Sequence, residues 1–277
     1  MIQLFDITEA RYFCRALANH QPGFGQSLAD FHDRLRVTHL RENTNDFEIH
    51  RVSLLNAIER WILFGVANYR RALDMFIPSN APWAQVTLYY SSFYAANAIL
   101  GMFGAWIHYR RLVDVETGSA NSQVLRISRR LQSHSTQTGS HRVFWDMFYE
   151  GYNSISPNVP IALQSSTSPV NNDRFWQINN RNDLNYDMFK AFEGATLFEN
   201  SFKPQRLRRS LRGPLALQLE VTEGMLKLAI YFANDFQINS FPYLGLGNGN
   251  RSVLMRRLIT KEVPHLVNQS DLHTLFQ

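Results

Sequence analysis

The chain has 277 residues, of which 45% are hydrophobic and 18% charged, so a folded core is easily supplied and wholesale disorder is excluded. The formal net charge of +5 identifies a ligand only if the arginines cluster in space. The single cysteine, Cys14, excludes an internal disulfide and any multi-cysteine metal site, and we expect it to be a small buried hydrophobe in a reducing compartment. No apolar run approaches the roughly 18 residues needed to span a bilayer, which predicts a cytoplasmic protein with no membrane segment.

The first fifty residues predict two helices, around "ITEARYFCRALANH" and "SLADFHDRLRVTHL", separated by a proline and glycine break. The following "RENTNDFE" is typical of a polar loop. We therefore expect residues 1–50 to form an N-terminal helical extension.

The next two segments predict an antiparallel helix pair. Apolar residues recur every three or four positions in "HRVSLLNAIERWILFGVANYRRALDMF", and "PSNAP" then ends that helix. Helical spacing resumes in "WAQVTLYYSSFYAANAILGMFG", where the alanines are small enough for another helix to approach closely.

The pattern then changes to a period of two. The segments "WIHYRRLVDV" and "QVLRIS" alternate between apolar and polar residues on either side of "ETGSANS", which predicts a short β-hairpin.

The segments after the hairpin return to helical spacing, with one interruption. A helix is expected around "HRVFWDMF", then a surface loop or partly ordered lid over "NSISPNVPIALQSSTSPVNN", and further helical material in "DRFWQINNRNDLNYDMFKAFEGATLFENSF". Pro214 opens a final core helix.

Several kinds of catalytic site are disfavoured by the sequence. The nine histidines lack metal-binding spacing, so neither a metal nor another cofactor is predicted. The "GLGNGN" run lacks the lysine of a P-loop and is better explained as a turn, and no GxSxG nucleophile motif occurs.

The segment "KPQRLRRSLRGP" is a candidate RNA-binding surface. Its cationic side chains are Lys203, Arg206, Arg208, Arg209 and Arg212. Guanidinium groups suit bidentate phosphate contacts, and each neutralised phosphate releases condensed counterions. A solvated connection between helices explains the same residues equally well.

Three segments, taken in order, resemble the HEPN superfamily. The "LYYSSFYAANAILGMFG" helix looks like the signature second helix of HEPN domains, and "GSHRVFWDMF" and "RNDLNYD" are similar to later segments of one branch of that superfamily. The resemblance covers about residues 51–236. It implies a mainly α fold, an HEPN-like antiparallel helical bundle with a small inserted β-hairpin and extra terminal helices, with the domain at 51–238 and a C-terminal extension at 239–277.

The resemblance also implies candidate site residues. HEPN ribonucleases commonly use an arginine, an adjacent polar residue and a later histidine; Arg181 and Asn182 match the first two, and Tyr186 stands where the histidine would be. Arg181 would stabilise charge at phosphorus. Tyrosine is a poor proton shuttle at neutral pH. Either Tyr186 orients a phosphate while His141 or His134 supplies acid and base chemistry, or the site binds RNA without cutting it.

A purely structural interpretation remains open beside this one. Asn182 or Asp183 would cap a helix, while Arg181 and Tyr186 would tie adjacent helices together through hydrogen bonds.

Two functions therefore follow as expectations. The first is an RNA-directed HEPN-like protein of a prokaryotic toxin–antitoxin or anti-phage system, either a metal-independent endoribonuclease or a degenerate RNA-binding relative, acting as a homodimer or HEPN-type heteromer. The alternative is a noncatalytic helical interaction module that regulates a partner protein.

Overall fold

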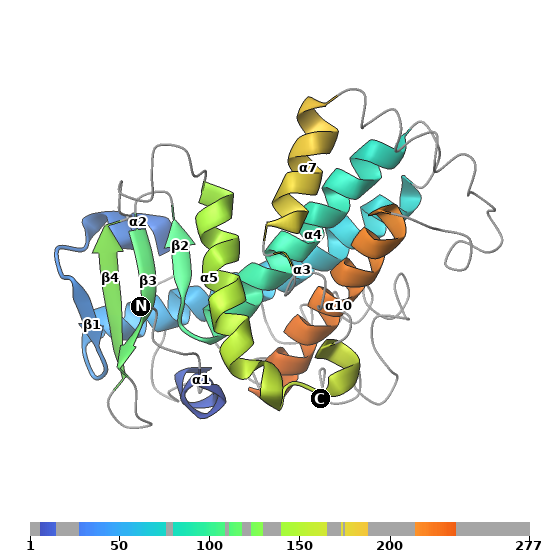
Figure 1. The fold of residues 1–277 in the computed structure, drawn as a ribbon. Coiled ribbons are helices and arrows are strands. Elements are labelled where there is room, and N and C mark those ends of the chain that lie inside the picture. Colours follow the sequence, from blue (N-terminus) through green and yellow to red (C-terminus); the bar gives the residue numbers. More distant parts are fainter. Residues whose placement is uncertain are drawn as a thin grey trace, which may run out of the picture.

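The protein is mainly helical with one small antiparallel sheet, which confirms the predicted fold class (Figure 1). The structure, a computed structural model, describes residues 6–14, 28–75, 80–108, 111–117, 123–129, 140–164, 173, 175–187 and 214–236. The helices are α1 (Ile7–Cys14), α2 (Leu28–Arg34), α3 (Asn45–Asp74), α4 (Ala81–Met102), α5 (Ser140–Ile155), the 3-10 turn η2 (Ser156–Asn158), α7 (Trp176–Tyr186) and α10 (Pro214–Asp235). Within these ranges, no helix combines the length and the apolar character needed to cross a membrane.

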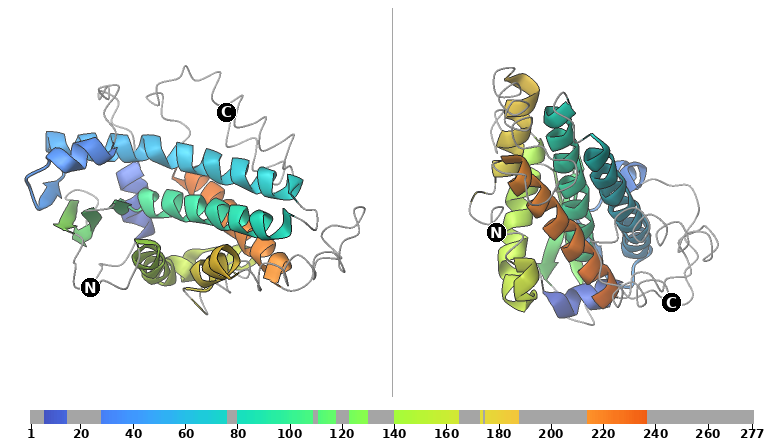
Figure 2. Two further views of the ribbon diagram at one scale, coloured as in Figure 1. Left: turned by 90° about the horizontal axis from the view of Figure 1, so that it is seen from above. Right: turned by 90° about the vertical axis from the view of Figure 1, so that its right-hand side faces the viewer.

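Helices α3 and α4 form the centre of the molecule and run antiparallel side by side, as predicted (Figure 2). The start of α3 is fixed by Thr44, whose Oγ1 accepts a hydrogen bond from the backbone N–H of Phe47 at 3.3 Å. Pro82 lies in the first turn of α4, where its missing N–H costs no helical hydrogen bond. Helix α4 is buried along almost its whole length because α3, α7 and α10 pack around it.

The predicted final helix, α10, packs across α4 and reaches α3. The three helices meet at Gly65, where a Cβ atom would lie 2.9 Å from Leu226 Cδ2 and 3.3 Å from the Ser91 carbonyl oxygen. The Oγ of Ser91 also donates a 2.6 Å hydrogen bond to the carbonyl of Gly65. The absence of a side chain at Gly65 therefore sets how closely the three helices approach.

The sheet contains the predicted hairpin and the additional strand β1, and the single strand expected over "WIHYRRLVDV" is divided into β2 and β3. Its members are β1 (His39–Arg41), β2 (Trp106–His108), β3 (Arg111–Thr117) and β4 (Val124–Arg129), in the order β1-β4-β3-β2. Strands β3 and β4 form the hairpin, with Asp114 opposite Arg126 and joined to it by a 2.6 Å ion pair. Every neighbouring pair is antiparallel.

Strand β1 corrects two predictions for the N-terminal region. The second helix ends at Arg34 instead of continuing through "RVTHL", and residues of that segment enter the sheet. The supposed loop "RENTNDFE" contains the end of β1 and the first turn of α3. Pairing with β4 stabilises the strand conformation of β1. The backbone N–H of Gln123 also donates to Glu42 Oε2 at 2.9 Å and so holds the residue that follows β1. Such long-range pairing leaves no local sequence pattern.

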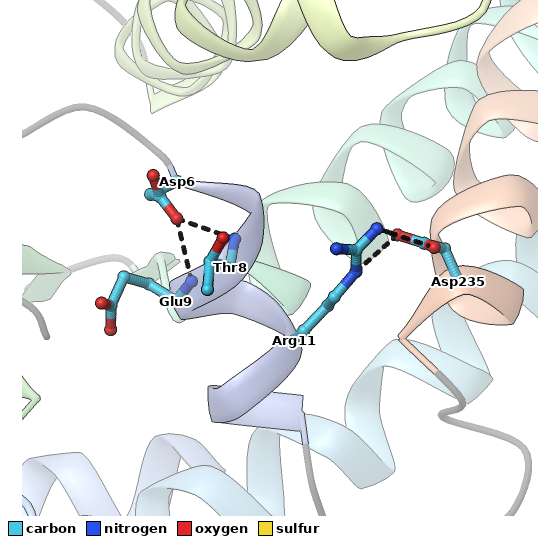
Figure 3. A network of polar contacts seen from close by, with 5 residues as sticks. All are labelled: Asp6, Thr8, Glu9, Arg11 and Asp235. Atoms are coloured by element: carbon cyan, nitrogen blue, oxygen red, sulfur yellow. Dashed lines mark hydrogen bonds and ion pairs between the residues drawn. The ribbon is translucent and has the colours of Figure 1, made fainter. Parts of the chain in front are cut away.

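Helix α1 is attached to the end of α10 (Figure 3). The Asp6 carboxylate accepts hydrogen bonds from the backbone N–H groups of Thr8 and Glu9 at 2.7 and 3.0 Å and so caps α1. From the same helix, Arg11 donates to both carboxylate oxygens of Asp235 at 3.1 and 3.0 Å. Cys14, as expected, is fully buried, and its thiol donates to the Met102 carbonyl at 3.3 Å.

Candidate functional site

The "RNDLNYD" segment forms the second half of α7, which packs along α4 (Figure 1). Helix α7 begins at Trp176, so neither Asn182 nor Asp183 caps its start, and that part of the structural interpretation is wrong. The helix lies within the segment expected to be helical, and its first turn falls in the apolar "FWQI" stretch, where Ile178 is buried in the core. Arg181 does connect two helices, since it bonds to Tyr90 on α4.

The guanidinium group of Arg181 is held by neutral groups. Its Nη2 donates to the Tyr90 hydroxyl at 3.1 Å, and its Nη1 donates to Asn182 Oδ1 at 2.9 Å. Its Cζ lies 5.9 Å from the centroid of the Tyr90 ring and 6.0 Å from that of Tyr186. The Nε atom is buried and has no acceptor, and no carboxylate among the described residues forms an ion pair with this side chain. The positive charge of Arg181 is therefore not compensated by any described anionic group.

A second polar group, His141 at the start of α5, lies beside this arginine. The Tyr89 hydroxyl is 2.6 Å from His141 Nδ1, and Trp145 Nε1 donates to the same hydroxyl at 3.3 Å. Indole N–H groups only donate, so Trp145 occupies one lone pair of the hydroxyl oxygen. If the Tyr89 proton then goes to Nδ1 of His141, all three groups are satisfied and the imidazole carries its own proton on Nε2.

Burial favours the neutral forms of both His141 and Tyr89, and the charge of Arg181 acts in the same direction on His141 only. Burial lowers the pKa of His141 from its usual 6.5, and the nearby positive charge of Arg181 lowers this pKa further. Burial raises the pKa of Tyr89 to about 12, against the opposing hydrogen bond from Trp145 and charge of Arg181. The charge of Arg181 thus lowers the pKa of both His141 and Tyr89, although burial decides the direction for Tyr89.

A further arginine, on α5, contacts residues at the start of α7. Arg142, which follows His141, is exposed; its Nη2 donates to Asn179 Oδ1 at 3.4 Å, and its Cζ lies 5.4 Å from the Phe175 ring centroid. No described carboxylate forms an ion pair with it either. Arg142, Tyr89 and Tyr90 were not among the expected site residues, although the first belongs to "GSHRVFWDMF" and the other two to "LYYSSFY".

The structure thus brings together the four residues expected to form the site. Arg181 donates to Asn182 and lies over the Tyr186 ring, and His141 is linked to Arg181 through the neighbouring residues Tyr89 and Tyr90. Tyr186 is 78% exposed, so one side of the cluster is open to solvent. The basic residues predicted to bind RNA, which are Lys203, Arg206, Arg208, Arg209 and Arg212, lie outside the described residues, as do His134 and the C-terminal extension.

In the parts of the chain that the structure describes, no three or more histidine, cysteine, aspartate or glutamate side chains gather as metal ligands would.

No protein-family model, curated protein or solved structure matches this chain. The resemblance to HEPN domains and the domain boundaries at 50 and 238 therefore stay predictions.

Proposed function

We propose that this protein is RNA-directed and binds backbone phosphates at a site built from Arg181, Asn182, Tyr186 and His141. The observation that carries the proposal is the half-buried guanidinium of Arg181, which has aromatic and amide partners and no described carboxylate partner. Because no described anionic group balances this charge, a phosphate oxygen could serve as its counterion. Guanidinium groups also match phosphate geometry.

The chemistry of the neighbours favours binding over cleavage. With Nδ1 of His141 accepting from Tyr89, the Nε2–H is a donor for a phosphate oxygen and not a base for a ribose hydroxyl. Tyr186, in the place of the expected histidine, adds an exposed ring on which a base can stack. We therefore propose the degenerate RNA-binding relative in preference to the metal-independent endoribonuclease.

The first prediction tests Arg181 directly. The charge-neutralising variant Arg181→Gln should weaken binding of a single-stranded RNA, measured by fluorescence anisotropy in EDTA, by roughly tenfold or more, since a hydrogen bond to a charged group contributes about 1.5–3 kcal/mol. The matched control is Arg41→Gln, an exposed arginine on β1, far from α7 in Figure 1. Unchanged affinity of a folded Arg181→Gln protein would disprove the RNA site.

The same samples, analysed for products on a denaturing gel, separate binding from cleavage. The RNA is expected to stay intact in EDTA over hours. Cleavage that disappears in both Arg181→Gln and His141→Gln would instead establish the endoribonuclease.

The alternative, a noncatalytic module that regulates a partner protein, has its own supporting observation. Phe64 on α3 is 51% exposed and packs against Tyr94 at a ring-centroid distance of 5.7 Å, and Trp83 on α4 is 63% exposed. Exposed aromatic side chains of this size are enriched at protein interfaces. A stoichiometric protein complex lost in Phe64→Ser, together with absence of RNA binding, would favour this function.

A further inference from the structure

One face of α7 carries contacts from both arginines. Phe175, Asn179, Asn182 and Tyr186 follow the helical spacing of four, three and four residues, so these side chains lie in one line along the helix. Arg142 contacts the first two of these side chains, and Arg181 contacts the last two.

The two guanidinium groups therefore lie at different points along α7. The centres of their contact pairs are separated by about seven residues, which at 1.5 Å per residue places the charges roughly 10 Å apart along the helix axis. One phosphate group is too small to contact both. Neither arginine has an ion-pair partner in the described parts of the chain, so each has the capacity to accept its own anion.

We propose that Arg142 is a second phosphate anchor, so that the site takes a polynucleotide strand laid along α7 and not a mononucleotide or free phosphate. This inference rests on the proposed RNA-binding function and deepens it. A nucleic acid is favoured over an acidic peptide because each guanidinium lies against an aromatic ring, and the Tyr186 ring is open for base stacking.

Salt dependence of binding tests the anchor. For a single strand, the slope of log K against log salt concentration is about −0.7 for each phosphate neutralised. Binding of a single-stranded RNA 12-mer should therefore lose about 0.7 from the magnitude of this slope in Arg142→Gln and about 1.4 in the double variant Arg142→Gln/Arg181→Gln. Affinity for the 12-mer should also fall several-fold in Arg142→Gln, while Arg142→Lys keeps most of the slope because it keeps the charge.

A mononucleotide provides the matched probe. Uridine monophosphate binding, followed by NMR titration, should be unaffected by Arg142→Gln and weakened by Arg181→Gln. Because Arg142 is exposed, its replacement should leave the thermal unfolding midpoint unchanged, so a loss of binding cannot be assigned to unfolding.

The outcomes separate the anchor from the proposed function. If Arg181→Gln lowers the salt slope and Arg142→Gln does not, the second anchor is disproved and RNA binding stands. If neither variant changes binding, or no RNA binds, both fail. Equal affinity for a polyglutamate peptide of the same charge would also overturn the inference, in favour of an acidic protein partner.

Discussion

The Tyr89 hydroxyl connects a buried tryptophan to a histidine at the candidate site. Trp145 is fully buried, and its indole N–H donates to the hydroxyl oxygen of Tyr89. The same oxygen orients the His141 ring through Nδ1. Replacing this one atom therefore affects both the stability of the core and the geometry of the site.

At this residue we predict the effect of Tyr89→Phe. Loss of the hydroxyl leaves the buried indole N–H without this acceptor, which should lower the free energy of unfolding by about 1–3 kcal/mol in urea denaturation. The control is Tyr94→Phe on the same helix, since Tyr94 is half-buried and its described contacts are with the rings of Phe64 and Phe93. That variant should stay within about 0.5 kcal/mol of wild type. Equal losses in the two variants would show that the Tyr89 hydroxyl has no special role.

At the scale of elements, the contact of α3, α4 and α10 depends on a residue without a side chain. Alanine normally favours a helix over glycine by about 1 kcal/mol. At Gly65, however, a Cβ atom would be 2.9 Å from Leu226 and 3.3 Å from a backbone carbonyl of α4, and the carbonyl cannot move without shifting that helix. Steric overlap should outweigh the gain in helix propensity.

We therefore predict that Gly65→Ala lowers the free energy of unfolding by about 1–3 kcal/mol. A double-mutant cycle with Leu226→Val checks the cause, because the shorter side chain removes part of the overlap. The double variant should lose less stability than the two single variants added together. Strict additivity would place the cost of the alanine somewhere other than the contact with Leu226.

At the scale of the whole molecule, two buried histidines join the N-terminal elements to the helical core. His32 Nε2 on α2 lies 2.8 Å from His50 Nδ1 on α3, and the His32 ring centroid is 4.7 Å from that of Trp106 on β2. Burial lowers the pKa of His50 to about 4, against a backbone hydrogen bond at Gly104 that opposes the shift. The folded protein thus holds His50 neutral in the junction between α2, α3 and the sheet.

This burial predicts how global stability depends on pH. Between about pH 6.5 and pH 4 the unfolded chain binds a proton at His50 and the folded chain does not, so acidification favours unfolding. The contribution of His50 is fully present above pH 6.5 and is lost as pH falls toward 4, by about 3 kcal/mol at most. Thermal unfolding of His50→Asn should show a weaker pH dependence over this window than that of wild type. The same pH dependence in His50→Asn as in wild type would contradict this assignment.

Helices and the hairpin were predictable because their signals are local. The apolar spacing of α3, α4 and α10 and the alternation of β3 and β4 are visible in short windows. Strand β1 was not predictable, since its one buried residue, Leu40, depends on a partner strand far along the chain. Helix α7 also lies inside a segment that was expected to be helical, although its apolar first turn carries no side-chain cap.

Part of the candidate site could likewise be predicted from the sequence, and part could not. Arg181, Asn182 and Tyr186 share one segment, so the family resemblance could select them together. The bond from Arg181 to Tyr90 joins residues 91 positions apart and exists only once α7 packs on α4. Arg142 shows no distinctive spacing, and only the folded structure reveals its contacts with the ring of Phe175 and the amide of Asn179.

The hydrogen bond from Gln123 to Glu42 joins positions 81 residues apart, and this separation has a consequence during translation. At roughly 5–20 residues per second, β1 leaves the ribosome about 4–16 s before the strand that completes it. During that interval the backbone N–H and C=O groups of β1 that will pair with β4 form hydrogen bonds with water. A strand of three residues, His39–Arg41, offers a very short edge to other nascent chains, so the delay carries little risk of aggregation.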